Sequence, residues 1–402
     1  MNPLLKVLCL AGPLAFAGCQ RSPLPSNATW FGTLQLPETT IPFHMELDLS
    51  GPKPAGAFIV GAEKTPIPEI SRSENALTFS FSEYGAEMRG SWDGKKLEGD
   101  YLRHRATGTK SFPFSASPNL EEVQREQTAP TGDYQVVFEG QTPEEATTVA
   151  SIGKVGPVGY QGTFIAPDGD YGLLEGSPTQ DGIQLHRFTG WQGITIELKR
   201  EGADWSGMVH AVHLDKPLSF KLQPRNDSAA AGGEQVRMKN PNAPFAFACT
   251  SLTGETIRNT DERFKGKALA VDIMGTWCHN CMDESPVLEE LYKQYGKDGF
   301  EVVGLSFEIK EDAELGKKNL TLFRDRFKLT YPLLYCGSLD DANVEKQLKS
   351  QLDNFVAYPT TLFINKKGKM QTIHQGFQGP GTGDRYPLQV KKLHNLAEQT
   401  LR

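Results

Sequence analysis

Cysteine is absent from residues 20 to 248, which is more than half of the chain. That part has no disulfides, so any thiol chemistry is confined to the C-terminal part. The sequence also lacks a second C-x-x-C pair, which a four-cysteine zinc site requires, and Met282 stands where a haem attachment motif needs histidine. No carboxylate or cysteine cluster surrounds His186, His210 and His213. We therefore expect no metal and no other cofactor.

Basic runs and long apolar runs are missing as well. The net charge is −7 and no Lys/Arg cluster is interleaved with aromatic residues, so nucleic-acid binding is excluded. After residue 20, no apolar stretch approaches the roughly 18 residues that a membrane span needs. At 402 residues the chain is too long for one core, and two or three domains are expected.

The N-terminal residues have the pattern of an export signal. Lys6 precedes an apolar run, Val7 to Ala17, that is too short to span a membrane. The small residues before Cys19 resemble a bacterial lipid-attachment site. We predict that residues 1–18 are a lipoprotein signal peptide and that lipidated Cys19 anchors a periplasm-facing protein in the inner or outer membrane. Because Ala15-Phe-Ala17 also fits an ordinary cleavage site, a soluble periplasmic protein is the alternative.

Two stretches of the cysteine-free part look like copies of each other. Gly56-Ala-Phe-Ile-Val is matched by Gly162-Thr-Phe-Ile-Ala, and further strand-like pairs follow at a spacing of 106 to 108 residues. Period-2 alternation and Asp-Gly or Glu-Gly turns predict antiparallel strands. We predict two sandwich- or barrel-like β modules, residues 29–117 and 131–224, and a linker over 225–237. Their cores are expected to be filled by Trp30, Trp92, Trp191 and Trp205, and the alternative is that these residues line a substrate-binding groove.

One pair of cysteines lies where a strand, a tight turn and a helix follow one another. Ala268 to Met274 predicts the strand, Trp277-Cys-His-Asn-Cys281 lies at the turn, and Ser285 to Tyr295 has helical spacing. Cys278 faces the positive end of the helix dipole, which favours its thiolate. Cys281, one turn further on, can close a disulfide with it. We predict a catalytic dithiol in which Cys278 is the exposed nucleophile and Cys281 the resolving thiol.

The stretch Val271 to Cys281 resembles the active-site segment of the thioredoxin superfamily. Pro286 stands where those proteins have a helix-kinking proline, and Ala357-Tyr-Pro-Thr-Thr361 resembles their cis-proline loop. With Asn242-Ala-Pro-Phe245, the resemblance is to the TlpA/ResA-like branch and covers residues 238–402. We therefore expect an α/β thioredoxin-like C-terminal domain preceded by two mostly antiparallel β modules.

Two carboxyl groups are candidates for the base that deprotonates Cys281. The resemblance places Asp272 at the buried carboxylate of thioredoxins, and burial raises a carboxyl pKa toward neutrality. Glu308 follows the predicted strand Glu301 to Phe307 and is the second candidate. The alternative for each is a hydrogen-bonded structural acid.

Four more residues are predicted to serve the dithiol. His279 would tune it, because a protonated imidazole beside Cys278 stabilises the thiolate. Trp277 is expected to shield the pair. The Tyr358–Pro359 bond is predicted to be cis and to present a backbone edge to a client strand, which makes Trp277, Tyr358 and Pro359 the predicted substrate-binding residues.

The remaining cysteines of the C-terminal part, Cys249 and Cys336, fall in predicted strands. We expect them to be inert buried thiols, with a structural disulfide between them as the alternative.

Taken with the resemblance, these features predict an exported thiol–disulfide oxidoreductase that acts as a protein-disulfide reductase. Its partners would be disulfide-bearing client proteins and an upstream membrane or periplasmic electron donor. One alternative is a thiol peroxidase of the redoxin type, although the Pro-x-x-x-Thr-x-x-Cys turn of a peroxidatic cysteine is absent. The other is a non-enzymatic docking protein that carries a thioredoxin-like module.

Overall fold

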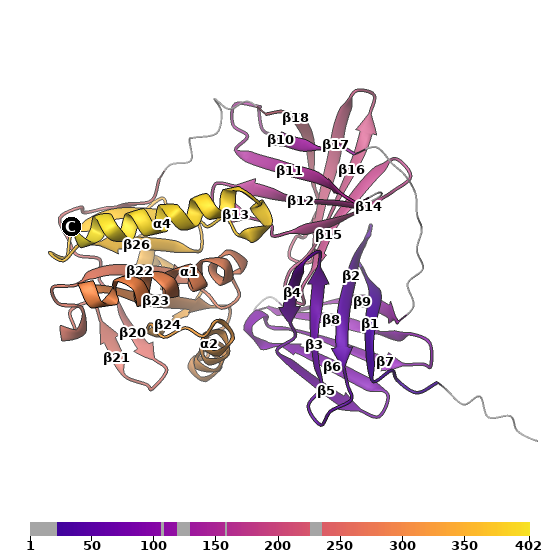
Figure 1. Ribbon diagram of the computed structural model, residues 1–402, viewed down its shortest axis with the longest axis horizontal. Coiled ribbons are helices and arrows are strands. Elements are labelled where there is room, and N and C mark those ends of the chain that lie inside the picture. Colours follow the sequence, from indigo (N-terminus) through magenta and orange to yellow (C-terminus); the bar gives the residue numbers. More distant parts are fainter. Residues whose placement is uncertain (1–21, 106–107, 119–128, 157–158, 226–234) are drawn as a thin grey trace, which may run out of the picture.

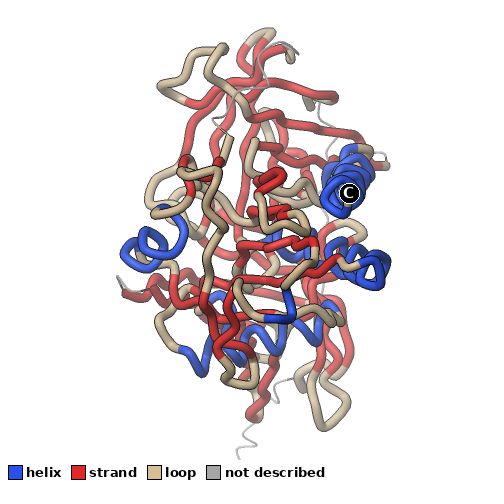
Figure 2. The backbone as a smooth tube through the Cα atoms, turned by 90° about the vertical axis from the view of Figure 1, so that its left-hand side faces the viewer, coloured by secondary structure: helices blue, strands red, loops and turns tan. Residues whose placement is uncertain are grey.

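The computed structural model describes residues 22–105, 108–118, 129–156, 159–225 and 235–402. Three units make up this part of the chain: two β modules and a C-terminal domain in which helices flank a sheet (Figure 1). Within the described ranges every α-helix belongs to the C-terminal domain, whereas strands occur in all three units. Strands accordingly make up much of the backbone (Figure 2). The predicted fold class is confirmed.

Some sequence predictions fall on residues outside this part of the chain. The signal peptide over residues 1–18 and the lipidation of Cys19 lie there, as does most of the linker over 225–237. Among the helices within the described ranges, none has the length and apolar character of a membrane span.

The first β module is an open antiparallel sheet. Its strands are β1 (Asn27–Gln35), β2 (Thr40–Asp48), β3 (Ala55–Val60), β4 (Glu63–Pro66), β5 (Glu69–Ser73), β6 (Ala76–Phe81), β7 (Ala86–Trp92), β8 (Leu97–Arg105) and β9 (Gly108–Ser117). They follow the order β4-β3-β2-β1-β9-β8-β7-β6-β5, and the 3-10 turn η1 (Ser82–Tyr84) joins β6 to β7. Alternate residues of β2, such as Phe43, Met45 and Leu47, point into the core. Trp30 and Trp92 meet there edge to face, which confirms their predicted place.

The second β module is closed. Its strands are β10 (Gly132–Phe138), β11 (Thr148–Val155), β12 (Gly159–Ala166), β13 (Gly169–Asp170), β14 (Leu174–Pro178), β15 (Gly182–Phe188), β16 (Gly193–Glu201), β17 (Asp204–Ala211) and β18 (Leu218–Pro224). The order is β11-β10-β18-β17-β16-β15-β14-β12-β13, and a further β11–β12 pairing closes the sheet into a barrel. Trp205 is half-buried against the barrel core.

Trp191 is the exception among the four tryptophans. It lies in the loop between β15 and β16 and packs against the ring of His279 in the C-terminal domain, so the prediction that it fills a β core is wrong. The two sheets span Asn27–Ser117 and Gly132–Pro224. That each is an independent domain stays a prediction.

The C-terminal domain contains a seven-stranded mixed sheet. Its strands are β20 (Ala248–Ser251), β21 (Thr256–Arg258), β22 (Ala268–Met274), β23 (Phe300–Glu308), β24 (Leu333–Ser338), β26 (Thr360–Ile364) and β27 (Met370–Gln375), in the order β21-β20-β24-β23-β22-β26-β27. The helices are α1 (His279–Tyr295), α2 (Ala313–Phe327), α3 (Asp341–Val344) and α4 (Arg385–Leu401). A separate small sheet pairs β19 (Arg237–Met238) with β25 (Leu352–Asp353). The strand predicted at residues 268–274 is β22, and the one predicted at 301–307 lies within β23.

Strand β22 is buried on both faces. Its side chains point alternately to the two faces of the sheet, and each face packs into a separate part of the core. Leu269, Val271 and Ile273 belong to a cluster with residues of the 245–264 segment and α3. Ala270 and Met274 face the other way, into a cluster with α1, α2 and α4. By the same alternation Asp272 points toward these helices, so an ionisable group lies in the apolar core beneath α1.

Cys249 and Cys336 form a disulfide, so the expectation of free thiols is wrong. The reason is the register of two neighbouring strands: Thr250 on β20 lies opposite Tyr335 on the antiparallel β24, which places Cys249 opposite Cys336 with 4.8 Å between their Cα atoms. This pairing joins residues 87 positions apart in sequence.

We expect the double variant Cys249→Ser/Cys336→Ser to lower the stability of the oxidised protein by roughly 2–4 kcal/mol, because a long loop is no longer closed in the unfolded chain. The melting temperature should fall by about 5–15 °C. Differential scanning calorimetry of the full chain checks this. In dithiothreitol, which reduces the disulfide of the parent, the variant and the parent should have the same melting temperature. A difference in melting temperature under these conditions would mean that the substitutions disturb packing.

Candidate active site

Cys278 and Cys281 form a disulfide where β22 passes into α1. Cys278 is the N-cap residue of α1, and its Sγ atom accepts a hydrogen bond from the backbone N–H of Cys281 at 3.2 Å. The unpaired N–H groups of the first helical turn and the helix dipole favour a negative sulfur at this position. The geometry therefore suits a Cys278 thiolate when the pair is reduced.

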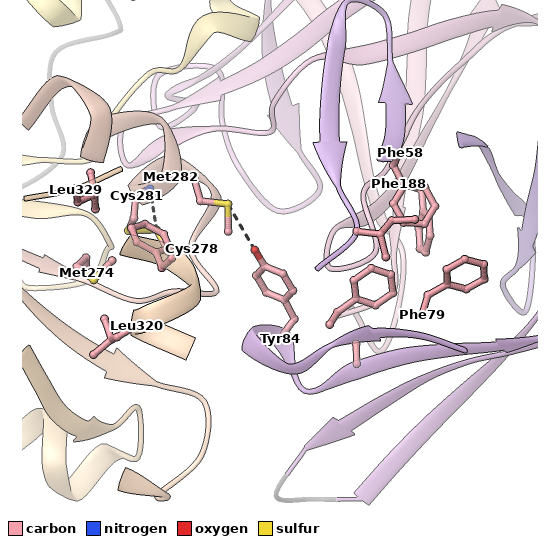
Figure 3. Close-up of a cluster of buried hydrophobic side chains, with 14 of the residues drawn as sticks. Phe58, Phe79, Tyr84, Phe188, Met274, Cys278, Cys281, Met282, Leu320 and Leu329 are labelled. Atoms are coloured by element: carbon pink, nitrogen blue, oxygen red, sulfur yellow. Dashed lines mark hydrogen bonds between the residues drawn. A yellow bond between two sulfur atoms is a disulfide. The ribbon is translucent and has the colours of Figure 1, made fainter. Parts of the chain in front are cut away.

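Both sulfurs are enclosed by apolar side chains. Cys278 is 5% exposed and Cys281 is fully buried, within a cluster that includes Met274, Met282 and Leu320 (Figure 3). Sequence reasoning expected an exposed nucleophile. Cys278 is the more exposed of the two, and the β modules lie over its neighbours His279 and Met282 at the start of α1.

Two buried carboxyl groups face each other beneath α1. Asp272 on β22 lies opposite Thr361 on β26, and the Thr361 hydroxyl donates to Glu284 of α1 at 3.1 Å. Neither oxygen of Asp272 has a hydrogen-bond partner among the described residues. Burial raises the pKa of Asp272 to about 8. Burial, and then the charge of Asp272, raise the pKa of Glu284 well above its ordinary value. The pair can therefore hold a proton near neutral pH and release it.

Glu284 was missed by sequence reasoning, although a signal was present. It stands three residues after Cys281, so both side chains lie on the same face of α1. A glutamate on the buried face of an amphipathic helix carries a desolvation cost and is a candidate functional residue for that reason.

Glu308 is placed differently from Asp272. At the end of β23, its carboxylate accepts hydrogen bonds from the backbone N–H and the hydroxyl of Thr276, at 3.2 and 2.7 Å, and from Ser306 at 2.5 Å. Burial raises the pKa of Glu308, but these donors oppose the rise. Glu308 thus fixes the turn that carries Trp277 and Cys278. That it acts as a base stays a prediction, and these contacts also fit the alternative of a structural acid.

The other predicted substrate residues line one side of the turn. Trp277 donates its indole N–H to the carbonyl of Phe307 at 2.8 Å and meets Tyr358 edge to face. The Tyr358–Pro359 bond is cis, as predicted. Nearby, Val356 is 75% exposed, an unusual position for a large apolar side chain. This side of the site therefore combines half-buried aromatic rings with an exposed apolar residue.

His279 lies on the opposite side, under the β modules. Its Nε2 atom is 3.4 Å from Asp283, and its ring packs on Trp191 with 5.4 Å between centroids. Burial, with Arg187 and Arg326 nearby, lowers the pKa of His279 well below its ordinary value. The lowered pKa favours the neutral imidazole in this arrangement. Tuning of the dithiol by a protonated His279 stays a prediction.

Comparison with known sequences places the C-terminal domain among thioredoxin-like proteins. Residues 241–373 match the family model of the AhpC/TSA family. The thioredoxin-like protein YneN of Bacillus subtilis is 32% identical over 130 residues, which cover 32% of this chain and 68% of that protein. The thiol-disulfide oxidoreductase ResA of Geobacillus thermodenitrificans is 33% identical over 133 residues, 32% of this chain and 66% of that protein. The chain thus spans about two thirds of the length of each.

Among solved structures, a thiol:disulfide interchange protein of the thioredoxin family from Chlorobium tepidum is similar to this chain. It is 18% identical, with a TM-score of 0.31, over 40% of this chain and 98% of that one.

The raised pKa of Asp272 makes stability depend on pH. The folded protein binds a proton that the unfolded chain has lost between about pH 4 and 8, so stability falls as the pH rises through this window. We expect Asp272→Asn, which cannot ionise, to be more stable than the parent above pH 8, by about 2–5 kcal/mol, and equally stable below pH 4. Urea denaturation of the oxidised protein at pH 3.5 and 8.5 measures the difference. The control is Asp298→Asn, a substitution of an exposed aspartate. If the two variants showed the same change in unfolding free energy between pH 3.5 and 8.5, the raised pKa could not be assigned to Asp272.

Proposed function

The C-terminal domain belongs to the ResA-like thiol–disulfide oxidoreductases of the thioredoxin superfamily, and on this premise we propose that the protein is an exported reductase of protein disulfides. The observation that carries the proposal is the dithiol at the start of α1, with a buried carboxyl pair beneath it and a cis-proline loop beside it.

The reaction begins with the reduced pair. The Cys278 thiolate attacks one sulfur of a client disulfide, which forms a mixed disulfide and releases the other client sulfur as a thiolate that takes up a proton. Cys281 then loses its proton to the Asp272–Glu284 pair and attacks the Cys278 sulfur. The second client sulfur leaves as a thiolate and takes up the proton held by the carboxyl pair, and the Cys278–Cys281 disulfide remains. The client has gained two electrons from the dithiol, one proton from Cys281 and one from water, so an upstream donor must reduce the pair again.

We assign client binding to the side of Trp277, Tyr358 and Pro359. The aromatic rings and the exposed Val356 offer apolar contact on that side of the turn. The backbone before Pro359 could pair with an extended client strand, as in other recognition by β-strand addition.

Export is proposed from the N-terminal pattern and from the Cys249–Cys336 disulfide, since such bonds persist in oxidising compartments. We propose a periplasm-facing lipoprotein anchored through Cys19, or a soluble periplasmic protein if Cys19 is not lipidated. The electron donor would then be a membrane or periplasmic protein.

A thiol peroxidase and a non-enzymatic docking module remain the alternatives. Peroxide reduction needs a peroxidatic cysteine in its own turn, whereas here both cysteines lie in a single helical turn that suits disulfide exchange. Rapid consumption of hydrogen peroxide by the reduced protein would favour the peroxidase. Absence of any exchange with disulfides would favour the docking module.

We expect Cys278→Ser to abolish reduction of insulin by the dithiothreitol-coupled protein, because no thiolate remains to attack. Cys281→Ser should instead accumulate a mixed disulfide, visible by mass spectrometry without reductant. The matched control is Cys249→Ser/Cys336→Ser, which removes two cysteines from the same domain and should keep the activity. Parent-like insulin reduction by Cys278→Ser would rule out the mechanism.

A further inference from the structure

The start of α1 is covered by aromatic residues from both β modules. Tyr84, in η1 of the first module, donates its hydroxyl hydrogen to the Sδ atom of Met282 at 3.5 Å (Figure 3). The Tyr84 ring stacks on Trp191 of the second module with 5.2 Å between centroids, and Trp191 packs in turn on His279. Three rings from three units thus form a continuous stack beside Cys278.

Polar contacts hold the second module against the same end of the C-terminal domain. The Asp170 carboxylate accepts hydrogen bonds from the backbone N–H groups of Gly172, in its own module, and of Gly379, at 2.7 and 2.6 Å. Gly169 forms an isolated β-bridge with Phe377. Gly172 approaches so closely that a Cβ atom there would lie 2.9 Å from Nε2 of His279. The segment from Gly169 to Gly172 therefore sits directly over the residues between the two cysteines.

The two β modules are joined tightly to each other. Phe188 of the second module inserts among the aromatic rings of the first, with its centroid 5.0 Å from that of Phe58 and 5.3 Å from that of Tyr101. Arg187 pairs with Glu63 across the same boundary at 2.6 Å. A buried aromatic contact combined with a half-buried ion pair resists separation. The modules should move as one body.

We propose that the two β modules, residues 27–117 and 132–224, form a lid that closes over the dithiol, and that Trp191 and Tyr84 are the residues that latch it. The proposal rests on the proposed function, since it describes how access to the same cysteines is regulated. In the closed state Cys278 is shielded from a client disulfide. Opening exposes its sulfur and returns His279 to water, where the imidazole can be protonated and stabilise the thiolate.

The chain offers a substitution that wedges the lid open without touching a catalytic group. Gly381 lies in the 3-10 turn η5 (Pro380–Thr382), and a Cβ atom there would meet two backbone atoms of the lid, the nitrogen of Leu173 at 2.6 Å and the carbonyl carbon of Gly172 at 3.0 Å. Backbone atoms cannot move aside by changing rotamer, so alanine must push the lid away. The φ angle of Gly381 is not positive, so the local backbone accepts alanine.

The matched control is Gly296→Ala. Gly296 follows α1 with φ of −57°, and nothing lies within 4 Å of the position of its Cβ atom. Trp191→Ala removes the latch itself, and Trp191→Phe keeps an aromatic ring in place.

The test is the rate at which iodoacetamide alkylates Cys278 in the fully reduced chain, measured on tryptic peptides by mass spectrometry. We expect Gly381→Ala and Trp191→Ala to react about tenfold faster than the parent, and Gly296→Ala and Trp191→Phe to react close to the parent rate. Insulin reduction should rise in the same two variants. Circular dichroism confirms folding, and if Trp191→Ala does not fold, Gly381→Ala decides alone.

Alkylation rates that are equal in the parent and in Gly381→Ala would overturn the lid, whatever the activity. Faster alkylation without insulin reduction in any variant would support the lid and overturn the reductase function instead. If Cys278 were alkylated faster in Trp191→Phe than in the parent, while Gly381→Ala reacted at the parent rate, the result would count against the latch as well.

Discussion

The sulfur atoms of Cys278 and Cys281 lie between two surroundings with opposite effects on charge. The backbone N–H groups at the start of α1 favour a negative sulfur, whereas the apolar cluster around both atoms disfavours any charge. Disulfide exchange needs a charged Cys278 thiolate for the attack and leaves an uncharged, enclosed disulfide as the product. The other groups of the site serve to take the proton from the attacking thiol and to return it.

The buried carboxyl pair and the lid lie on opposite sides of the dithiol, and both affect whether its sulfurs are charged. Asp272 and Glu284 lie beneath the helix and keep a proton within the core, where water cannot supply one. Tyr84 and Trp191 lie above it, against Met282 and His279. With the lid closed, both sulfurs lie among apolar side chains, which suits the oxidised, uncharged disulfide. Access and thiolate stability would therefore change together when the lid moves.

Features that depend on local sequence could be predicted, and features that depend on contacts between distant segments could not. The strand β22, the turn with its cysteines and the cis bond before Pro359 each follow from a few neighbouring residues. Pairing of Cys249 with Cys336 depends on which strands become neighbours in the sheet, and a periodic pattern carries no information about that. The surroundings of His279 and Met282 depend on residues more than 80 positions away in the sequence, Trp191 and Tyr84.

The short sheet of β19 and β25 sets how far the lid can travel. Pro224 ends the last strand of the lid, and Arg237 is already paired with Asp353 in the body of the C-terminal domain. The intervening chain can bridge at most about 45 Å even when fully extended. An opened lid therefore stays at an effective concentration in the millimolar range next to the surface it left. A client protein would have to compete with the tethered lid for the surface around Cys278. A client that binds weakly would therefore be displaced when the lid closes again.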